Sequence, residues 1–221
     1  MTLHITSPPA LNCPLCAATP SSFYHRDRTR TYWQCPCCDL VFVPPAARLD
    51  ARAEKAIYDL HENEPSDPGY RRFLTRLTKP LLPRLTKADH GLDFGCGPGP
   101  ALAQMLSEAG MTMDLYDAFY KPNRAVWQHR YEFITATEVV EHLYNPAYEW
   151  ARLFATLKPG GWLGIMTKRV RDQAAFVGWH YITDPTHVCF YSEATFAWIA
   201  GQWGAKLLLP GADVALLQKQ E

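Results

Sequence analysis

A glycine-rich turn between an apolar stretch and a helical pattern is the feature that most restricts the fold of this sequence. The segment 92–100 reads Leu-Asp-Phe-Gly-Cys-Gly-Pro-Gly-Pro, and its glycines occupy alternate positions. A helix is predicted from Ala101, with apolar residues on one face and Gly110 as its end. Glycine permits a tight turn and lets a ligand approach the backbone where no Cβ intervenes. The pattern therefore predicts a buried strand, a ligand-binding turn and a helix, in that order.

The acid in this turn indicates which ligand it binds. Dinucleotide-binding folds use Gly-x-Gly-x-x-Gly and place a pyrophosphate on the helix N-terminus. This chain has Asp-x-Gly-x-Gly-x-Gly over residues 93–99, and a carboxylate favours a cationic or amine-bearing ligand over a phosphate. The pattern resembles the first motif of class I S-adenosylmethionine (AdoMet) methyltransferases, whose cofactor carries an amino group and a sulfonium.

Four further segments resemble successive parts of that family's α/β, Rossmann-like sheet. Together with the glycine-rich turn, the resemblance covers about residues 50–221. In chain order the segments match the family's second strand, its fourth strand, the helix–turn–strand that follows, and the final antiparallel hairpin strand: residues 111–117, 131–138, 157–167 and 214–218. We therefore expect an AdoMet-binding methyltransferase domain over residues 86–221.

The resemblance also implies cofactor-binding residues in two places. The turn would shape the pocket for the methionine part of AdoMet through four residues, Asp93, Gly95, Gly97 and Gly99. Asp117 would end the second strand about 20 residues past the turn, where doubly wound folds place the acceptor for the ribose hydroxyls.

The connection after the second strand is unusually short. Only 15 residues lie between Asp117 and Phe133, where the family normally fits a helix, a third strand and another helix. One crossover with its helix already needs about a dozen residues. The third strand is therefore expected to be missing or vestigial, and no adenine-binding residue can be assigned.

Four cysteines near the N-terminus predict a structural zinc site. Cys13 and Cys16 form one Cys-x-x-Cys knuckle, and Cys35 and Cys38 form a second, with 18 residues between the inner cysteines. Two such knuckles supply the four thiolates of a tetrahedral zinc ribbon. Cys37 competes for the fourth position, but the spacing within the knuckle favours Cys38. Disulfide pairing is the alternative, and a cytosolic setting argues against it.

The segments before the methyltransferase domain divide into a zinc ribbon at 1–45 and a helical lid or linker at 46–85. The ribbon serves either substrate recognition or a structural role. Its loop carries three arginines between aromatic residues, namely Arg26, Arg28 and Arg30. Such a loop could contact a phosphate backbone, but we favour a solvated hairpin. Four residues of the second segment are candidates for covering the cofactor: Tyr58, His61, Asn63 and Tyr70.

The catalytic candidates follow the predicted fourth strand. If the chain is helical there, Glu138, Glu141 and His142 fall at i, i+3 and i+4 and share one face. With His187 from a later aromatic loop, they resemble the metal site of small-RNA 2′-O-methyltransferases, and a related site in ubiquinone-pathway O-methyltransferases. That resemblance implies a second divalent ion, which would lower the pKa of a coordinated hydroxyl. General-base catalysis by His142 or His187, and a purely structural role, are the alternatives.

Composition narrows the function without identifying the methyl acceptor. The formal net charge is zero, from 22 basic and 22 acidic side chains, which gives no support to a broad nucleic-acid-binding surface. No signal peptide or apolar run long enough to span a membrane is evident, so a cytoplasmic protein is expected. We predict methyl transfer from AdoMet to a small molecule or to RNA, with no protein partner evident and the oligomeric state open. The alternative is a non-catalytic AdoMet-binding or partner-docking module that acts through its zinc ribbon.

Overall fold

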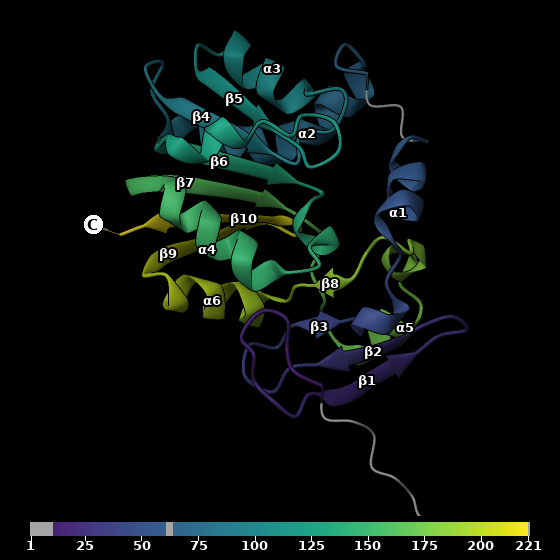
Figure 1. The fold of residues 1–221 in the computed structure, drawn as a ribbon. Coiled ribbons are helices and arrows are strands. Elements are labelled where there is room, and N and C mark those ends of the chain that lie inside the picture. The colour runs from purple at the N-terminus through teal and green to yellow at the C-terminus, as the bar shows by residue number, and fades with distance from the viewer. Residues whose placement is uncertain (1–10, 61–63, 221) are drawn as a thin grey trace, which may run out of the picture.

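The main sheet of the protein has six strands and confirms the predicted α/β, Rossmann-like class. A computed structural model describes residues 11–60 and 64–220. The first four strands of the spatial order and the sixth are parallel to one another, and the fifth is antiparallel to them (Figure 1). In spatial order the strands are β5 (Thr112–Tyr116), β4 (His90–Phe94), β6 (Tyr131–Thr137), β7 (Leu157–Met166), β10 (Val214–Lys219) and β9 (Ala205–Gly211).

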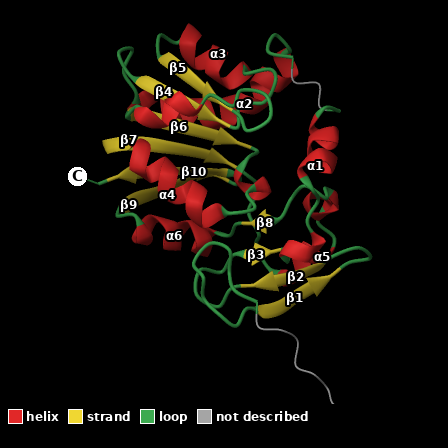
Figure 2. Cartoon of the chain, in the orientation of Figure 1, coloured by secondary structure: helices red, strands yellow, loops and turns green. Residues whose placement is uncertain are grey.

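Helices cover both faces of this sheet (Figure 2). On one face, α2 (Pro68–Leu81) and α3 (Ala101–Glu108) bury apolar side chains against the strands. On the other face lie α4 (Pro146–Thr156) and α6 (Glu193–Gln202), whose inward residues join a second apolar cluster. The remaining helical segments are α1 (Ala51–Tyr58) and α5 (Gln173–Val177), with short 3₁₀ turns η1 (Pro45–Ala47), η2 (Leu82–Arg84), η3 (Arg124–Gln128), η4 (Val140–His142) and η5 (His180–Thr183).

Several helices begin at residues whose side chains cap the first turn. The Asp50 side chain accepts from the Ala53 backbone N–H at the start of α1, and Ser192 forms a capping box with Thr195 at α6. Pro146 occupies the first turn of α4, but the Asn145 side chain makes no capping hydrogen bond.

The third strand of the family is missing from the described chain, as the short connection predicted. Between β5 and β6 the structure has the 3₁₀ turn η3, so β5 is the edge of the sheet. Trp127 of η3 packs edge-to-face on Tyr116 of β5, with the ring centroids 4.8 Å apart. The Arg152 guanidinium lies 3.6 Å from the centre of the Trp127 ring. Aromatic and cation–π packing thus replaces strand pairing at this edge.

The N-terminal ribbon is not separate from the rest of the chain. Its strands β1 (Ser22–Arg26), β2 (Thr31–Gln34) and β3 (Val41–Phe42) form an antiparallel sheet whose fourth strand is β8 (Cys189–Phe190). One buried apolar cluster runs from the ribbon into the methyltransferase sheet. The ribbon therefore packs as part of one structural unit with the segment that follows β7 (Figure 1).

Candidate active site and zinc site

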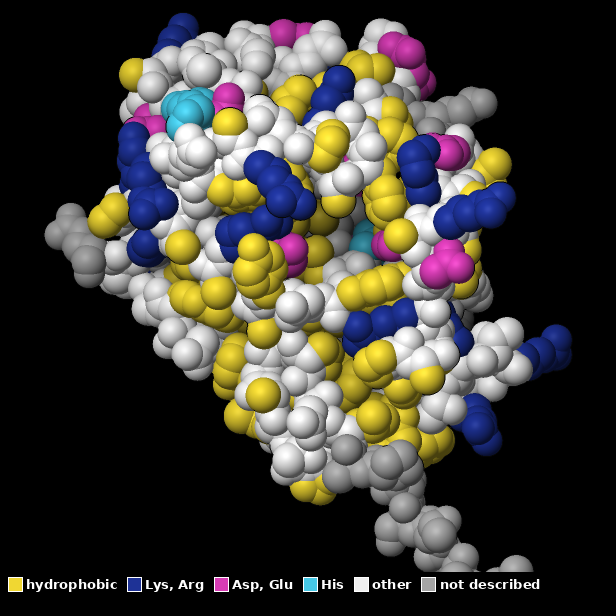
Figure 3. Space-filling model, viewed as in Figure 1, with side chains coloured by type: hydrophobic (Ala, Val, Ile, Leu, Met, Phe, Trp, Pro, Cys, Tyr) yellow, Lys and Arg dark blue, Asp and Glu magenta, His cyan; other side chains and the backbone are white. Residues whose placement is uncertain are grey.

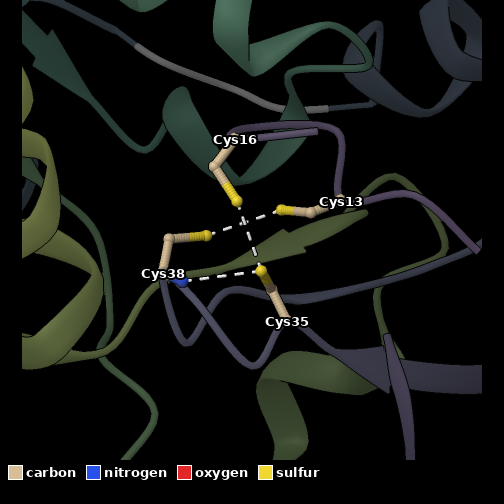
Figure 4. A group of neighbouring side chains, drawn as sticks. All are labelled: Cys13, Cys16, Cys35 and Cys38. Atoms are coloured by element: carbon tan, nitrogen blue, oxygen red, sulfur yellow. Dashed lines mark hydrogen bonds between the residues drawn. The ribbon is translucent and has the colours of Figure 1, made fainter. Parts of the chain in front are cut away.

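The four predicted zinc ligands converge on one point. The Sγ atoms of Cys13 and Cys38 are 3.5 Å apart and those of Cys16 and Cys35 are 3.3 Å apart (Figure 4). All four sulfur atoms lie within 4.8 Å of one another. Zinc–sulfur bonds of about 2.3 Å in a tetrahedron place the sulfurs about 3.8 Å apart, so four thiolates fit Zn²⁺ with small adjustments. Cys37 is exposed and is not part of this group, which agrees with Cys38 as the fourth ligand.

The glycine-rich turn has the backbone conformation that its sequence predicts. Gly95 has φ +74°, and a Cβ at this position would lie 2.4 Å from a methyl group of Val139. Gly97 has φ +62° and faces open space. Only glycine adopts such conformations without strain, and at Gly97 the open space leaves room for a ligand against the backbone.

Asp117 follows β5 and organises this turn. Its Oδ2 accepts a hydrogen bond from the Gly97 N–H at 3.0 Å. Its Oδ1 accepts from the N–H groups of Phe119 and Tyr120 at 2.8 and 3.0 Å. The carboxylate is thus held between the turn and the chain after β5, on the wall of the cavity described below.

Asp93 lies beneath the turn rather than in the cavity. It is 4% exposed, and its Oδ1 accepts a 2.8 Å hydrogen bond from the Thr135 hydroxyl. Burial raises the pKa of Asp93 to about 7. Asp93 and Gly99 do not line the cavity, whereas Gly95 and Gly97 do. Asp93 thus supports the turn from behind.

A cavity of about 720 Å³ opens at the carboxyl ends of β4, β5 and β6, where doubly wound sheets bind ligands. Helices α1 and α2 border it through Glu54, Tyr58, Tyr70 and Phe73. Figure 3 shows histidine and acidic side chains at the floor of a hollow between α1 and the sheet. Tyr58 and Tyr70 therefore lie where the sequence placed lid residues. The other two lid candidates, His61 and Asn63, lie outside the described residues.

The chain after β6 does not form the helix that would place three catalytic candidates on one face. Glu138 has φ +52°, a conformation uncommon for residues other than glycine, and the 3₁₀ turn η4 begins only at Val140. Nevertheless Glu141, His142 and His187 offer ligand atoms within 4.8 Å of one another. Glu138 is not part of this group, although it lines the same cavity.

Tyr181 connects the acidic residues, and sequence reasoning did not identify it. Its hydroxyl donates to Glu141 Oε1 and lies 3.4 Å from Glu138 Oε2. Glu141 is fully buried, and its Oε2 has no hydrogen-bond partner among the described residues. Burial raises the pKa of both glutamates, and the charge of Glu138 raises that of Glu141 further. No spacing in the sequence links a tyrosine of this later loop to the glutamates.

His187 is held with one ring nitrogen available as a base. Its Nδ1 is 2.7 Å from the Tyr181 carbonyl oxygen, and because a carbonyl only accepts, Nδ1 carries the proton. Burial lowers the pKa of His187 below its ordinary value of 6.5. The ring is therefore neutral at pH 7, with an unprotonated Nε2. His142 lies beside it, with the ring centroids 4.7 Å apart.

Arg30 of the ribbon fixes the loop that carries His187. Its guanidinium donates four hydrogen bonds of 2.6–3.0 Å to backbone carbonyl oxygens of that loop, and the residue is 7% exposed. The four acceptors are Ile182, Asp184, Pro185 and His187. The expectation of a solvated hairpin was wrong for Arg30, because no local pattern announces a partner so distant in the sequence.

Comparisons with known proteins identify the family of this chain. The methyltransferase domain family matches residues 67–209, more than half of the chain. The chain belongs to this family. It is therefore an AdoMet-dependent methyltransferase. The matched residues include the glycine-rich turn, Asp117 and the histidine cluster. No curated protein matches its sequence.

Two solved structures share the fold of this methyltransferase. The *Burkholderia thailandensis* 1,6-didemethyltoxoflavin-N1-methyltransferase is 18% identical with a TM-score of 0.55, and the match covers 90% of this chain and all of that one. An O-methyltransferase family protein from the same organism is 16% identical with a TM-score of 0.50, over 78% of this chain and 60% of that one. Among the described residues, no helix is both long and apolar enough to cross a membrane.

Proposed function

We propose that this enzyme transfers the methyl group of AdoMet to a hydroxyl or amine of a small molecule, with His187 as the general base. The observation that carries the proposal is the neutral His187 ring, whose Nδ1 is bonded to a carbonyl while Nε2 remains unprotonated. His187 also lines the cavity that begins at the glycine-rich turn. A neutral imidazole at this place can accept the proton that an oxygen or nitrogen nucleophile loses.

AdoMet fits the residues of the turn. The open space at Gly97 and the carboxylate of Asp117 suit a ligand with hydroxyl groups and no phosphate. When bound, AdoMet supplies a methyl group already activated by the sulfonium. The protein then has to align the acceptor with that methyl group and exclude water. Tyr58 and Tyr70 border the cavity and would limit access of water.

A small-molecule acceptor is favoured by the dimensions and walls of the cavity. Its volume of about 720 Å³ lies within the range of small-ligand sites, and α1 and α2 lie against it. Zero formal charge supplies no excess of basic residues for RNA. The related fold from *Burkholderia thailandensis* holds 1,6-didemethyltoxoflavin together with S-adenosylhomocysteine, which supports a fold of this kind accommodating both molecules.

Metal-assisted transfer is the second candidate, favoured by one specific observation. Glu141 Oε2 is buried without a hydrogen-bond partner among the described residues, beside His142 and His187. A carboxylate and two imidazoles are a donor set that divalent transition metals accept. These three residues, rather than the predicted four with Glu138, would hold the ion, which would supply a lowered pKa for a coordinated hydroxyl.

Labelled AdoMet identifies the acceptor class. We would incubate the enzyme with methyl-labelled AdoMet and cell extract separated into small-molecule, RNA and protein fractions. Label is expected in small molecules, and label confined to RNA would contradict the proposal.

His187→Ala should abolish transfer while S-adenosylhomocysteine still binds; His180→Ala, an exposed histidine of the same loop, is the matched control. Metal analysis of both variants separates general-base catalysis from metal-assisted transfer. Replacing a residue that binds the ion lowers the metal content, whereas replacing a general base does not.

A further inference from the structure

A third group of side chains that could hold a metal ion lies at the opposite end of the main sheet from the cavity. His90 opens β4, Asp114 lies within β5, and His129 follows η3. The glycine-rich turn follows the other end of β4. Figure 3 shows histidine side chains gathered beside an acidic one at the surface near the start of β4. Neither the methyltransferase chemistry nor the zinc ribbon uses this group.

The distances within the group match those between ligands of one metal ion. Asp114 Oδ2 is 3.2 Å from His90 Nε2 and 3.0 Å from His129 Nδ1. The three ligand atoms lie within 4.8 Å of one another. Metal–nitrogen and metal–oxygen bonds of about 2.0–2.2 Å separate adjacent ligands by about 2.9–3.5 Å, from octahedral to tetrahedral geometry. The two short separations therefore need no movement of the backbone.

Hydrogen bonding alone does not account for His90. Its Nε2 is buried and has no hydrogen-bond partner among the described residues, although Asp114 Oδ2 is 3.2 Å away. The two atoms are close without the alignment that a hydrogen bond requires. A metal ion between them needs the nitrogen lone pair instead of an aligned N–H.

Tyr131 supports the carboxylate from behind. Its hydroxyl is 2.8 Å from Asp114 Oδ2 and 2.9 Å from the Val126 carbonyl oxygen of η3. Such outer partners orient metal-binding carboxylates and are a regular part of metal sites. The Tyr131 hydroxyl, from the first residue of β6, thus links the Asp114 carboxylate of β5 to the backbone of η3.

We propose that His90, Asp114 and His129 bind a divalent transition-metal ion of the Zn²⁺ type, with water completing its coordination. Two imidazoles and one carboxylate favour such ions over Mg²⁺ or Ca²⁺, which prefer oxygen ligands. The ion ties the shortened connection after β5 to the sheet at the edge where the family has its third strand. This site is independent of the methyl acceptor and of His187.

Zinc titration of selected variants tests the site. Full-length protein whose cysteine site has first been filled with zinc is titrated with Zn²⁺ by calorimetry, and bound zinc is measured by mass spectrometry. Wild type, His187→Ala and the exposed control His180→Ala should each bind a further zinc ion that His129→Gln binds at least about tenfold more weakly. Zinc should also slow amide exchange in residues 118–130 of these three proteins, and much less at the same zinc concentration in His129→Gln.

Two results would overturn the proposal. One is wild-type protein that takes up no zinc beyond the cysteine site. The other is further zinc that is lost in His187→Ala and retained in His129→Gln, which would place it in the catalytic cluster. The His129 side chain is 52% exposed, so the variant should fold; circular dichroism checks this. Should it fail to fold, Asp114→Asn, which removes one ligand charge and keeps the side-chain size, gives the same readout.

Discussion

Replacing Arg30 by methionine should separate the structural role of the ribbon from its zinc. Methionine keeps an unbranched apolar stem but loses all guanidinium donors. Four carbonyl oxygens of the loop 182–187 would lose their partner. Because Arg30 is 7% exposed, water replaces these bonds only if the ribbon and the loop move apart.

The expected loss of stability follows from those four bonds. With a net contribution of about 1 kcal/mol each, Arg30→Met should lower the free energy of unfolding by about 4 kcal/mol. For a chain of this size, 1 kcal/mol corresponds to about 2–4 °C in Tm, so Tm should fall by roughly 8–16 °C. A shift of about 1 Å in the catalytic loop costs up to about 100-fold in rate. We therefore expect kcat to fall much more than affinity for S-adenosylhomocysteine, for which we propose binding at the glycine-rich turn.

Calorimetric unfolding, zinc content and transfer of labelled methyl groups measure these effects. The matched control is Arg28→Met, an exposed arginine of the same loop, which should resemble wild type in all three assays. Arg30→Met should retain its zinc, since the four hydrogen bonds of the Arg30 guanidinium go to the loop 182–187 and involve none of the four cysteines. Melting of Arg30→Met as high as that of Arg28→Met, or an unchanged kcat, would refute the coupling.

Three further predictions concern single residues. Cys38→Ser should lose the ribbon zinc and Cys37→Ser should retain it, as measured by metal content per chain; equal losses would contradict the ligand assignment. Burial raises the pKa of Asp93 from 3.8 to about 7, so its contribution to stability is complete below pH 3.8 and is lost as the pH rises through 7. Asp93→Asn should remove this pH dependence, which amounts to up to about 4 kcal/mol in the free energy of unfolding. The same pH profile in wild type and variant would be evidence against this role of Asp93. Asp117→Ala should weaken S-adenosylhomocysteine binding by at least about tenfold in calorimetry, since it removes a charged hydrogen-bond acceptor; undiminished affinity would exclude the ribose role.

The parts of the fold that are coded locally could be predicted from the sequence. The glycine-rich turn needs residues of one short segment, and glycine allows the positive φ that Gly95 and Gly97 adopt. The cysteine knuckles likewise depend on short spacings, and the choice of Cys38 over Cys37 followed from one of them. The missing third strand followed from chain length alone, because 15 residues between Asp117 and Phe133 are too few for two crossovers.

Contacts between distant segments could not be predicted in the same way. The bonds from Arg30 to the loop of His187, and from Tyr181 to Glu141, join residues whose proximity arises only when the sheet has formed. The position of Asp93 could not be predicted either, since a carboxylate beside a glycine-rich turn can lie in the ligand cavity or beneath the turn. Glu138 leaves β6 in a left-handed conformation, which interrupts a helical pattern that its neighbours suggest.

The pairing of β3 with β8 has a consequence for the order in which the protein matures during synthesis. The knuckles of the ribbon leave the ribosome before the methyltransferase sheet and can take up zinc early, but the strand that completes their own sheet is made only after β7. Until then Val41 and Phe42 present an unpaired apolar edge, which invites association with other chains. The Val43 N–H and the Glu141 carbonyl both bond to the backbone of Val188, so arrival of this strand closes the edge and positions the backbone of Glu141 in one event.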